Sequence, residues 1–297
     1  MKLKRVLSVL MVSAMFLTGC TSGNSGKQEE KKAEEEKSVK VVACSVAATN
    51  VLHELGADII GIPTTQLDIP EDLKDLPQVG QAMAPDLEKV ASLEPDVFVM
   101  DKSFKESVEE SMKEYDINTF YIDTTTYTNF LTSIEELGKE INKQEEAEKL
   151  ISSLKESEKE VAKIKGDTDA TVAILFGSGE NFMLATETSY LGDLLKTVGG
   201  TNIATELDGS AKSPYLQFSL EQIVQTNPDY ILRFAHGNLE ETKKAFDDAF
   251  DKNPAYAELD AVKNNKVIDL DSNIFNVSAN LNVSEAIKTL GGILYGE

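Results

Sequence analysis

Two segments of the chain repeat one pattern, and this repeat constrains the fold more than any other feature. LEKVASLEPDVFVM begins at Leu87 and LEQIVQTNPDYILR begins at Leu220, so they align without a gap at an offset of 133 residues. Each segment reads as a short amphipathic helix, a Pro-Asp break and a continuous apolar strand. A strand without polar alternation is typical of a parallel sheet that is buried on both faces.

The residues upstream of each copy also correspond. A strand-like run, VKVVACSV in the first half and ATVAILFGS in the second, precedes a helix-like run that stops at Gly56 or Gly199. Glycine at such a position supplies the left-handed residue that ends a helix. The sequence therefore predicts an α/β fold with two lobes of the same plan, arising from an internal duplication.

The residues between the two halves predict helices. Apolar residues recur at helical spacing from Phe130 to Ile141 and again from Leu150 to Ile164, while the other faces are rich in Glu and Lys. A break near Asn142 would leave a second helix of about 22 residues, roughly 33 Å long. A helix of that length would join the lobes rigidly.

The predicted fold is thus a pair of Rossmann-like α/β lobes joined by a long backbone helix. The expected parts are a signal peptide at 1–19, a flexible tether at 20–38, an N-terminal lobe at 39–126, a connecting helical segment at 127–166 and a C-terminal lobe at 167–297.

The first twenty residues, MKLKRVLSVLMVSAMFLTGC, have a basic start and then an apolar run that ends at Leu17. This charge and length are typical of a secretory signal and too short for a membrane-spanning helix. The end of the run resembles the lipobox of bacterial lipoproteins, which implies cleavage before Cys20 and a diacylglyceryl thioether on its sulfur. The other interpretation is an ordinary secreted protein with an incidental cysteine.

The segment after Cys20, TSGNSGKQEEKKAEEEKSVK, has no apolar face and reads as a flexible tether. If Cys20 is lipidated, Cys44 has no partner for a disulfide. We therefore expect Cys44 to be a free, buried thiol.

The chain is strongly acidic, with 51 acidic and 29 basic residues and a net charge of −22. Loss of the predicted signal would remove three positive charges and no negative one, which gives −25. This balance disfavours nucleic-acid binding through a basic surface. It suits solubility and electrostatic docking onto a basic partner.

These features together resemble the helical-backbone (class III) substrate-binding proteins of ABC importers, and within that class the IsdE-type haem-binding lipoproteins. The resemblance covers nearly the whole mature domain. The segments that carry it are GQAMAPDLEKV (80–90), SYLGDLLKTVGG (189–200), PDYILRFAHG (228–237) and AVKNNKVIDL (261–270).

The resemblance implies a monomeric receptor on the extracytoplasmic face of a Gram-positive cell membrane, which it touches through the lipid anchor only. Such a receptor accepts haem b, one per chain, from surface haem-donor proteins and passes it to an ABC permease. An enzyme is disfavoured because FGSGEN lacks the G-x-S-x-G elbow and no phosphate loop occurs.

By the same resemblance, Met83 and His236 are the two axial ligands of the haem iron. His236 follows an apolar strand, and ligands of open α/β sheets bind beyond the carboxyl ends of the strands. Met83 lies in the loop QVGQAMAPD, whereas the other mature methionines, Met100, Met112 and Met183, fit strand or helix patterns as core residues. Without the resemblance, a lone histidine is more often structural and a loop methionine more often fills a gap.

The haem propionates need partners, and the acidic chain offers few bases. The stretch CSVAATN turns from strand into helix, so the amides of Val46 and Ala47 would lie at a positive helix terminus. The resemblance adds the amides of Thr65 and Gln66 in the segment PTTQ. Ordinary helix and turn capping is the other interpretation of these four positions.

Glu88 and Glu221 occupy equivalent positions in the repeat. In the class that the chain resembles, an exposed glutamate on each lobe meets arginines of the permease, so both residues are candidate docking contacts. The alternative is that they are helix-start carboxylates that favour the helix dipole.

A receptor for a ferric siderophore or another iron chelate is the alternative function. It is disfavoured because Trp is absent and Arg233 is the only arginine in the C-terminal half, which argues against a basic pocket. A receptor for free Zn or Mn would need three or four His and carboxylate ligands, and the chain has two histidines.

Overall fold

The computed structural model describes residues 38–165, 170–178, 181–235, 239–252, 254–272 and 274–296. The predicted signal peptide, Cys20 and all but the last residue of the predicted tether lie outside these ranges, and so does His236. Within the described ranges, no helix combines the length and the hydropathy needed to cross a bilayer.

The N-terminal half forms a four-stranded sheet in which every pair of neighbours is parallel, in the order β2-β1-β5-β6. Its elements are β1 (Lys40–Ala43), α1 (Val46–Glu54), β2 (Asp58–Gly61), β3 (Gly80–Gln81), β4 (Ala84–Pro85), α2 (Leu87–Ser92), β5 (Val97–Asp101), α3 (Lys105–Glu114) and β6 (Thr119–Ile122), with 3-10 turns at Glu71–Leu73 and Lys102–Phe104. The strands β3 and β4 form a separate antiparallel hairpin.

The C-terminal half forms a larger sheet in the order β10-β8-β7-β11-β12, with β9 paired to the start of β7. Its elements are β7 (Thr171–Ser178), β8 (Asn181–Ala185), α7 (Tyr190–Val198), β9 (Thr201–Asn202), β10 (Tyr215–Leu216), α8 (Leu220–Thr226), β11 (Tyr230–Ala235), α9 (Leu239–Asp251), α10 (Asp260–Lys263), β12 (Val267–Asp269) and α11 (Val283–Tyr295), with 3-10 turns at Ile203–Glu206 and Pro254–Glu258.

The two sheets confirm the predicted duplication. The parallel order β2-β1-β5-β6 in the first half corresponds to β9-β7-β11-β12 in the second. Both copies of the repeat fold as predicted, α2 followed by β5 and α8 followed by β11. The C-terminal sheet differs in one respect, because β8 pairs antiparallel with the part of β7 beyond β9 and β10 pairs antiparallel with β8, which makes this sheet mixed.

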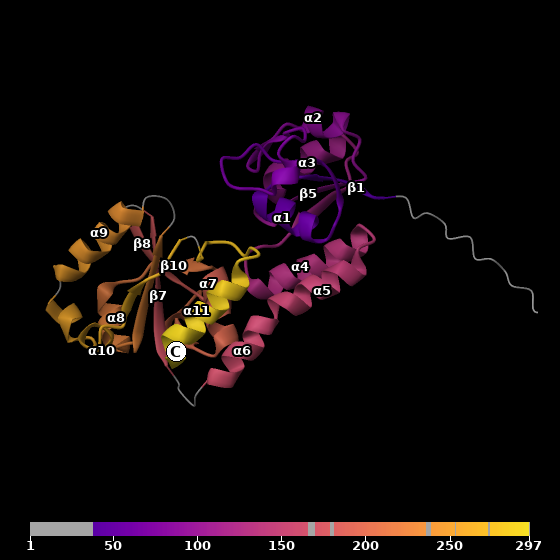
Figure 1. Cartoon of the computed structure of the whole chain (residues 1–297). Coiled ribbons are helices and arrows are strands. Elements are labelled where there is room, and N and C mark those ends of the chain that lie inside the picture. Colours follow the sequence, from indigo (N-terminus) through magenta and orange to yellow (C-terminus); the bar gives the residue numbers. More distant parts are fainter. Residues whose placement is uncertain are drawn as a thin grey trace, which may run out of the picture. The chain divides into compact units, whose positions relative to one another are not determined.

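The central strands are buried on both faces, as their continuous apolar sequence predicts. In the C-terminal sheet, Ile174 and Leu232 belong to one core cluster, while Leu175 and Ile231 belong to another. The helix α9 lies on one side of this sheet, and α7 and α11 lie on the other (Figure 1).

The aspartate of each Pro-Asp break explains why this dipeptide recurs. Asp96 accepts a hydrogen bond at Oδ2 from the amide of Lys40, the first residue of β1, at 2.9 Å. Asp229 accepts at Oδ2 from the amide of Thr171, the first residue of β7, at 2.8 Å, and from its hydroxyl at 2.9 Å. In both halves this contact fixes the start of the first strand beside the repeat strand.

The predicted helix end at Gly199 is confirmed. Gly199 follows the last residue of α7 with φ +86°, a left-handed conformation that other residues adopt only at a cost.

The connecting segment forms three helices where the sequence predicted two. The break near Asn142 is confirmed, with α4 (Tyr127–Glu140) before it and φ +58° at Asn142 itself. The predicted helix of about 22 residues is wrong, because it is divided into α5 (Gln144–Leu154) and α6 (Glu156–Ile164).

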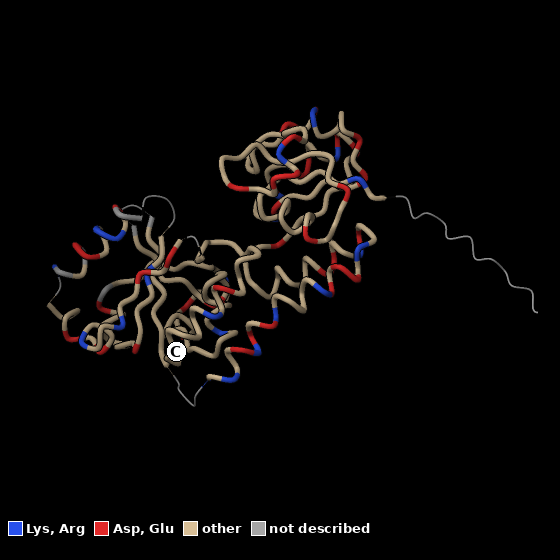
Figure 2. The backbone as a smooth tube through the Cα atoms, viewed as in Figure 1, with Lys and Arg blue, Asp and Glu red and all other residues tan. Residues whose placement is uncertain are grey.

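A competition for one carbonyl group explains this division. The carbonyl oxygen of Leu154 accepts hydrogen bonds from the hydroxyl of Ser157 at 2.9 Å and from that of Ser284 at 3.3 Å. Side-chain donors of this kind interrupt the regular helical ladder and bend helices. The exposed sides of the three helices carry acidic and basic residues along their length, including the pairs Lys139–Glu135 and Lys159–Glu156 (Figure 2).

We predict that Asp229→Ala lowers the free energy of unfolding by about 1–2 kcal/mol, because it leaves the amide that begins β7 without its charged acceptor. Urea denaturation measures the change. The matched control is Asp208→Ala, an exposed aspartate of the same half, which should change stability by less than about 0.5 kcal/mol. Equal effects of the two substitutions would contradict the assigned role of Asp229.

Candidate functional site

A pocket lies beyond the carboxyl ends of β1 and β2, where open α/β sheets bind their ligands. Its volume is about 380 Å³. The first turn of α1, the loop after β2 and the β3–β4 hairpin contribute to it. Its lining residues are Ser45, Val46, Pro63, Thr64, Thr65, Gln66, Leu67, Gln81 and Ala82. None of these side chains is charged.

The structure brings several predicted site residues together at this pocket. Val46, Thr65 and Gln66 line it, and Met83 follows directly after the lining residue Ala82. Ala47, one residue further along α1 than Val46, is not among the lining residues.

The start of α1 is capped, yet its first amides have no acceptor among the described residues. Ser45 is the N-cap, and its hydroxyl accepts from the amide of Ala48 at 3.1 Å. The amides of Val46 and Ala47 precede this bond and remain available to a ligand. The structure therefore combines ordinary capping at Ser45 with a free positive helix terminus.

The loop after β2 is a turn held by its own side chain. The hydroxyl of Thr65 accepts from the amide of Leu67 at 3.0 Å. In the described part of the chain, the amides of Thr65 and Gln66 have no acceptor. Like those at the start of α1, they are available as anion-binding donors.

Met83 lies in the two-residue turn of the β3–β4 hairpin, and 69% of it is exposed. Leu67, which lines the pocket, is also 69% exposed. Tyr115 is the one other large apolar residue that is exposed in the described ranges. Of these three exposed residues, Leu67 lines the pocket and Met83 directly follows a lining residue. Sequence reasoning missed Leu67, although an unpatterned leucine in a polar loop was a usable signal.

The remaining residues with sequence predictions behave largely as expected. Met100 and Met112 are buried, and Met183 is partly buried against the core. Cys44 is a free, buried thiol, and burial raises its pKa to about 12. The side chain of His53 is 37% exposed, and its Nε2 lies 3.2 Å from Oδ2 of Asp72.

The hairpin that carries Met83 has a constrained backbone. Gly80 has φ +94°, and a Cβ added there would lie 2.8 Å from the backbone nitrogen of Asp86. The carbonyl of Gly80 accepts from the amide of Thr64 at 2.7 Å, and the amide of Asp86 donates to Val79 at 2.8 Å. These bonds connect the hairpin to the loop that holds Thr65 and Gln66.

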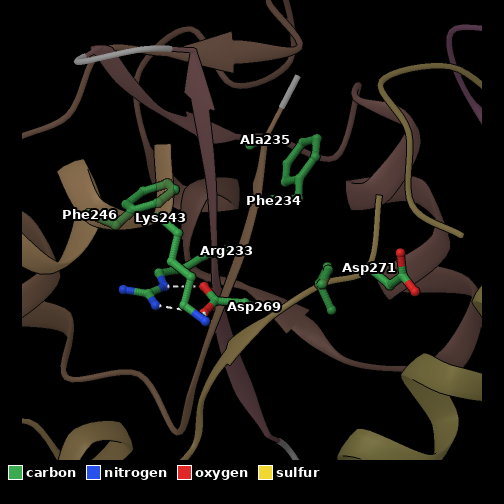
Figure 3. A pocket seen from close by; sticks show the side chains of 8 residues that line it. Arg233, Phe234, Ala235, Lys243, Phe246, Asp269 and Asp271 are labelled. Carbon is green, nitrogen blue, oxygen red and sulfur yellow. Dashed lines mark hydrogen bonds and ion pairs between the residues drawn. The ribbon is translucent and has the colours of Figure 1, made fainter. Parts of the chain in front are cut away.

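A second pocket, of about 230 Å³, lies at the carboxyl ends of β11 and β12 (Figure 3). It is lined by Arg233, Phe234, Ala235, Lys243, Phe246, Asp269, Leu270 and Asp271. Ala235 is the last residue of β11, and the predicted ligand His236 follows it outside the described residues.

The cations of this second pocket are paired. Arg233 is buried and donates to both carboxylate oxygens of Asp269, from Nε at 2.6 Å and from Nη2 at 2.9 Å (Figure 3). It also donates from Nη1 to Asp247 at 2.8 Å. Lys243 lies 3.2 Å from Asp269. Burial opposes ionisation of Asp269, but hydrogen bonds and charge from Arg233 and Lys243 hold its pKa below the ordinary value. Sequence reasoning counted Arg233 but did not find this network.

Glu88 and Glu221 are both exposed, each as the second residue of its helix, α2 or α8. Interactions with its own amide and with the hydroxyl of Ser219 lower the pKa of Glu221. Both carboxylates are therefore accessible at equivalent places of the duplicated fold.

Across the described ranges, no group of three or more His, Cys, Asp or Glu side chains could hold a metal. A family model described as periplasmic binding protein matches residues 41–274. The chain belongs to this family. It is therefore a substrate-binding protein and not an enzyme, in agreement with the sequence analysis.

Relatives in this family match almost the whole chain. High-affinity heme uptake system protein IsdE of Staphylococcus aureus (strain MRSA252) is 33% identical over 297 residues, 99% of each chain. The crystal structure of S. aureus IsdE complexed with heme is 31% identical over 87% of this chain and 99% of that chain, with a TM-score of 0.74.

Two further solved structures extend the comparison. An ABC transporter substrate-binding protein from Listeria monocytogenes EGD-e is 35% identical over 88% of this chain and 100% of that chain, with a TM-score of 0.78. S. aureus SirA complexed with staphyloferrin B is 25% identical over 88% of this chain and 94% of that chain, with a TM-score of 0.70. The similar structures thus include one complexed with heme and one complexed with staphyloferrin B.

We predict that Gly80→Ala destabilises the protein more than Gly209→Ala does. Both glycines have positive φ, so each substitution should cost about 1–2 kcal/mol of backbone strain. At Gly209 the added Cβ meets only a leucine methyl group at 3.5 Å, whereas at Gly80 it meets backbone atoms and should cost about 1–3 kcal/mol more. Urea denaturation measures the free energy of unfolding of both variants. Equal losses of stability would contradict a rigid hairpin.

We predict that Asp269→Ala lowers the free energy of unfolding by about 3 kcal/mol at pH 7, because it removes the bidentate partner of a buried arginine. The pKa of Asp269 is lowered in the folded state, so its contribution is present above the unfolded pKa of about 3.9 and declines as the pH falls below it. Wild type and variant should therefore converge in stability under acid conditions.

The control for this prediction is Asp248→Ala, which removes the exposed partner of Lys244 on α9. It should leave the stability close to that of wild type, because an exposed ion pair contributes little. A difference between wild type and Asp269→Ala that is unchanged from pH 7 to pH 3 would contradict the assigned ion pair.

Proposed function

We propose that the chain is a lipid-anchored haem receptor of an ABC importer. In this proposal the signal peptide is cleaved before Cys20, and Cys20 carries the lipid that holds the protein on the extracytoplasmic face of a Gram-positive cell membrane. The receptor is a monomer that takes one haem b from a surface donor protein and passes it to the permease for iron acquisition.

The observation that carries the proposal is the uncharged pocket beside the exposed Leu67 and Met83. Haem is a flat apolar macrocycle that needs an apolar surface, an iron ligand and partners for two propionates. A thioether is an established haem ligand. The available amides of Val46, Ala47, Thr65 and Gln66 supply donors without side-chain charge.

We infer that Met83 and His236 are the two axial ligands of the iron. Imidazole and thioether together give a six-coordinate, low-spin haem, and the methionine raises its reduction potential. Two protein ligands leave no open position for oxygen, so the arrangement suits carriage of haem rather than its turnover. The likeness to IsdE over 99% of both chains supports this assignment of substrate.

A receptor for a ferric siderophore is the second candidate, and the likeness to SirA favours it. Anionic ferric chelates need cationic side chains to balance their charge. The N-terminal pocket has no charged lining residue, and Arg233 is already bound to two aspartates. These observations favour haem.

We predict that hemin gives a Soret shift and a low-spin spectrum with the wild-type protein. Met83→Ala and His236→Ala should each lose the six-coordinate spectrum and weaken binding at least about tenfold. The matched controls are Tyr115→Ala, an exposed apolar residue away from the pocket, and His53→Ala, the other histidine, and both should bind as wild type does.

Two outcomes would contradict the haem assignment. Equal spectra in the ligand variants and their controls would exclude Met83 and His236 as ligands. Binding of an anionic ferric chelate without any response to hemin would establish the second candidate instead.

We further propose that Glu88 and Glu221 contact basic residues of the permease. Both are exposed at equivalent positions, although carboxylates at a helix start also interact favourably with the helix dipole. If these glutamates act through the helix dipole, their substitution should change the stability of the protein. If they contact the permease, their substitution should change transport.

We predict that the double variant Glu88→Lys, Glu221→Lys binds haem as wild type does but fails to support haem import in cells that depend on this receptor. The control is Glu145→Lys, Glu285→Lys, which reverses two exposed glutamates in the first turns of α5 and α11. Import at the wild-type rate in the first variant, or an equal loss in the control, would contradict the docking assignment.

A further inference from the structure

The thiol of Cys44 lies beneath the hairpin that carries Met83. Cys44 follows the last residue of β1 and is completely buried. Its Sγ lies 4.0 Å from the carbonyl oxygen of Gln81 and 3.9 Å from that of Ala82, both in hydrogen-bonding geometry for sulfur. These two carbonyl groups immediately precede Met83 in the chain.

The thiol is itself held by the sheet. The amide of Cys44 donates to the carbonyl of Val99 in β5 at 2.9 Å, so its backbone position is set by the central strand. On the other side of the hairpin, the amide of Thr64 donates to the carbonyl of Gly80 at 2.7 Å. The hairpin is thus connected both to the strand that leads into α1 and to the loop that holds Thr65 and Gln66.

We propose that Cys44 is a positioning residue for Met83, whose thiol holds the β3–β4 turn in register with the start of α1. The inference rests on the proposed function. Met83 has a flexible side chain on an exposed turn. The position of its sulfur therefore depends on a turn backbone that is held in place. A ligand group performs only when the residues behind it hold its geometry.

The chemistry of the thiol fits this role. Burial raises the pKa of Cys44 to about 12, so the sulfur keeps its proton and acts as a weak donor to the two carbonyl groups. The same burial makes it a poor nucleophile and metal ligand, since both reactions need the thiolate.

Hydrogen exchange of the ligand-free protein tests the positioning directly. We expect the amides of Thr64 and Asp86, which bond within and onto the hairpin, to exchange about fivefold faster in Cys44→Ala and in Cys44→Val. Valine fills the space without a donor, so it separates hydrogen bonding from packing. Val108→Ala, in the same core cluster, should leave both exchange rates unchanged relative to the rest of the lobe.

Two results of this experiment would overturn the proposal. Wild-type exchange rates at Thr64 and Asp86 in both Cys44 variants would exclude any positioning effect. Wild-type rates in Cys44→Val alone would assign the contact to packing and exclude the hydrogen bonds.

A second measurement concerns the ligand. In haem-loaded whole chain, both Cys44 variants should keep the haem but lose most of the methionine-dependent absorption band and show a lower reduction potential, approaching Met83→Ala. A full methionine signal in both would overturn the proposal. If wild type itself has no signal that depends on Met83, the proposed function fails, while the exchange experiment still decides the role of Cys44 in the hairpin.

Discussion

The hydrogen bond that each Pro-Asp aspartate accepts from the first strand of its half holds the start of that strand beside the repeat strand. Asp96 binds the amide that begins β1, and Asp229 binds the amide that begins β7. These contacts place Val41 beside Val97 and Val172 beside Tyr230, so the two central strands of each sheet run in a set register. Because parallel strands end together at one edge, the same contacts also determine which residues meet at the binding edge.

At that edge, the two halves differ in the charges that they present. The N-terminal half presents backbone amides and exposed apolar side chains at a pocket without charged lining residues. The C-terminal half buries Arg233 but surrounds it with Asp247 and Asp269, so little positive charge remains for a ligand. A flat, largely apolar ligand with carboxylates at its rim suits this combination better than a compact anion does.

The sequence predicted those parts that depend on local pattern. The repeat at Leu87 and Leu220 predicted helix, break and strand correctly because amphipathic spacing and proline act locally. The division of the second linker helix depends on Ser284, 130 residues from Leu154, and no local pattern contains that contact. Likewise, the partners of Arg233 come from other segments of the chain, Asp247 and Asp269, while His236 lies beyond the described residues.

The duplication also explains why the two candidate iron ligands occupy unlike positions. The segment before α2 forms a hairpin that exposes Met83, whereas the segment before α8 joins the sheet as β10 and packs Tyr215 against Phe176, with ring centroids 4.8 Å apart. In the residues that follow the repeat strands, the candidate ligand belongs to the C-terminal half instead. Asp101 at the end of β5 is engaged by Ser103 and Thr124, whereas β11 ends at an alanine that leads into His236. In the proposed assignment, one scaffold, used at a different place in each half, would therefore offer one soft sulfur and one imidazole in place of two identical ligands.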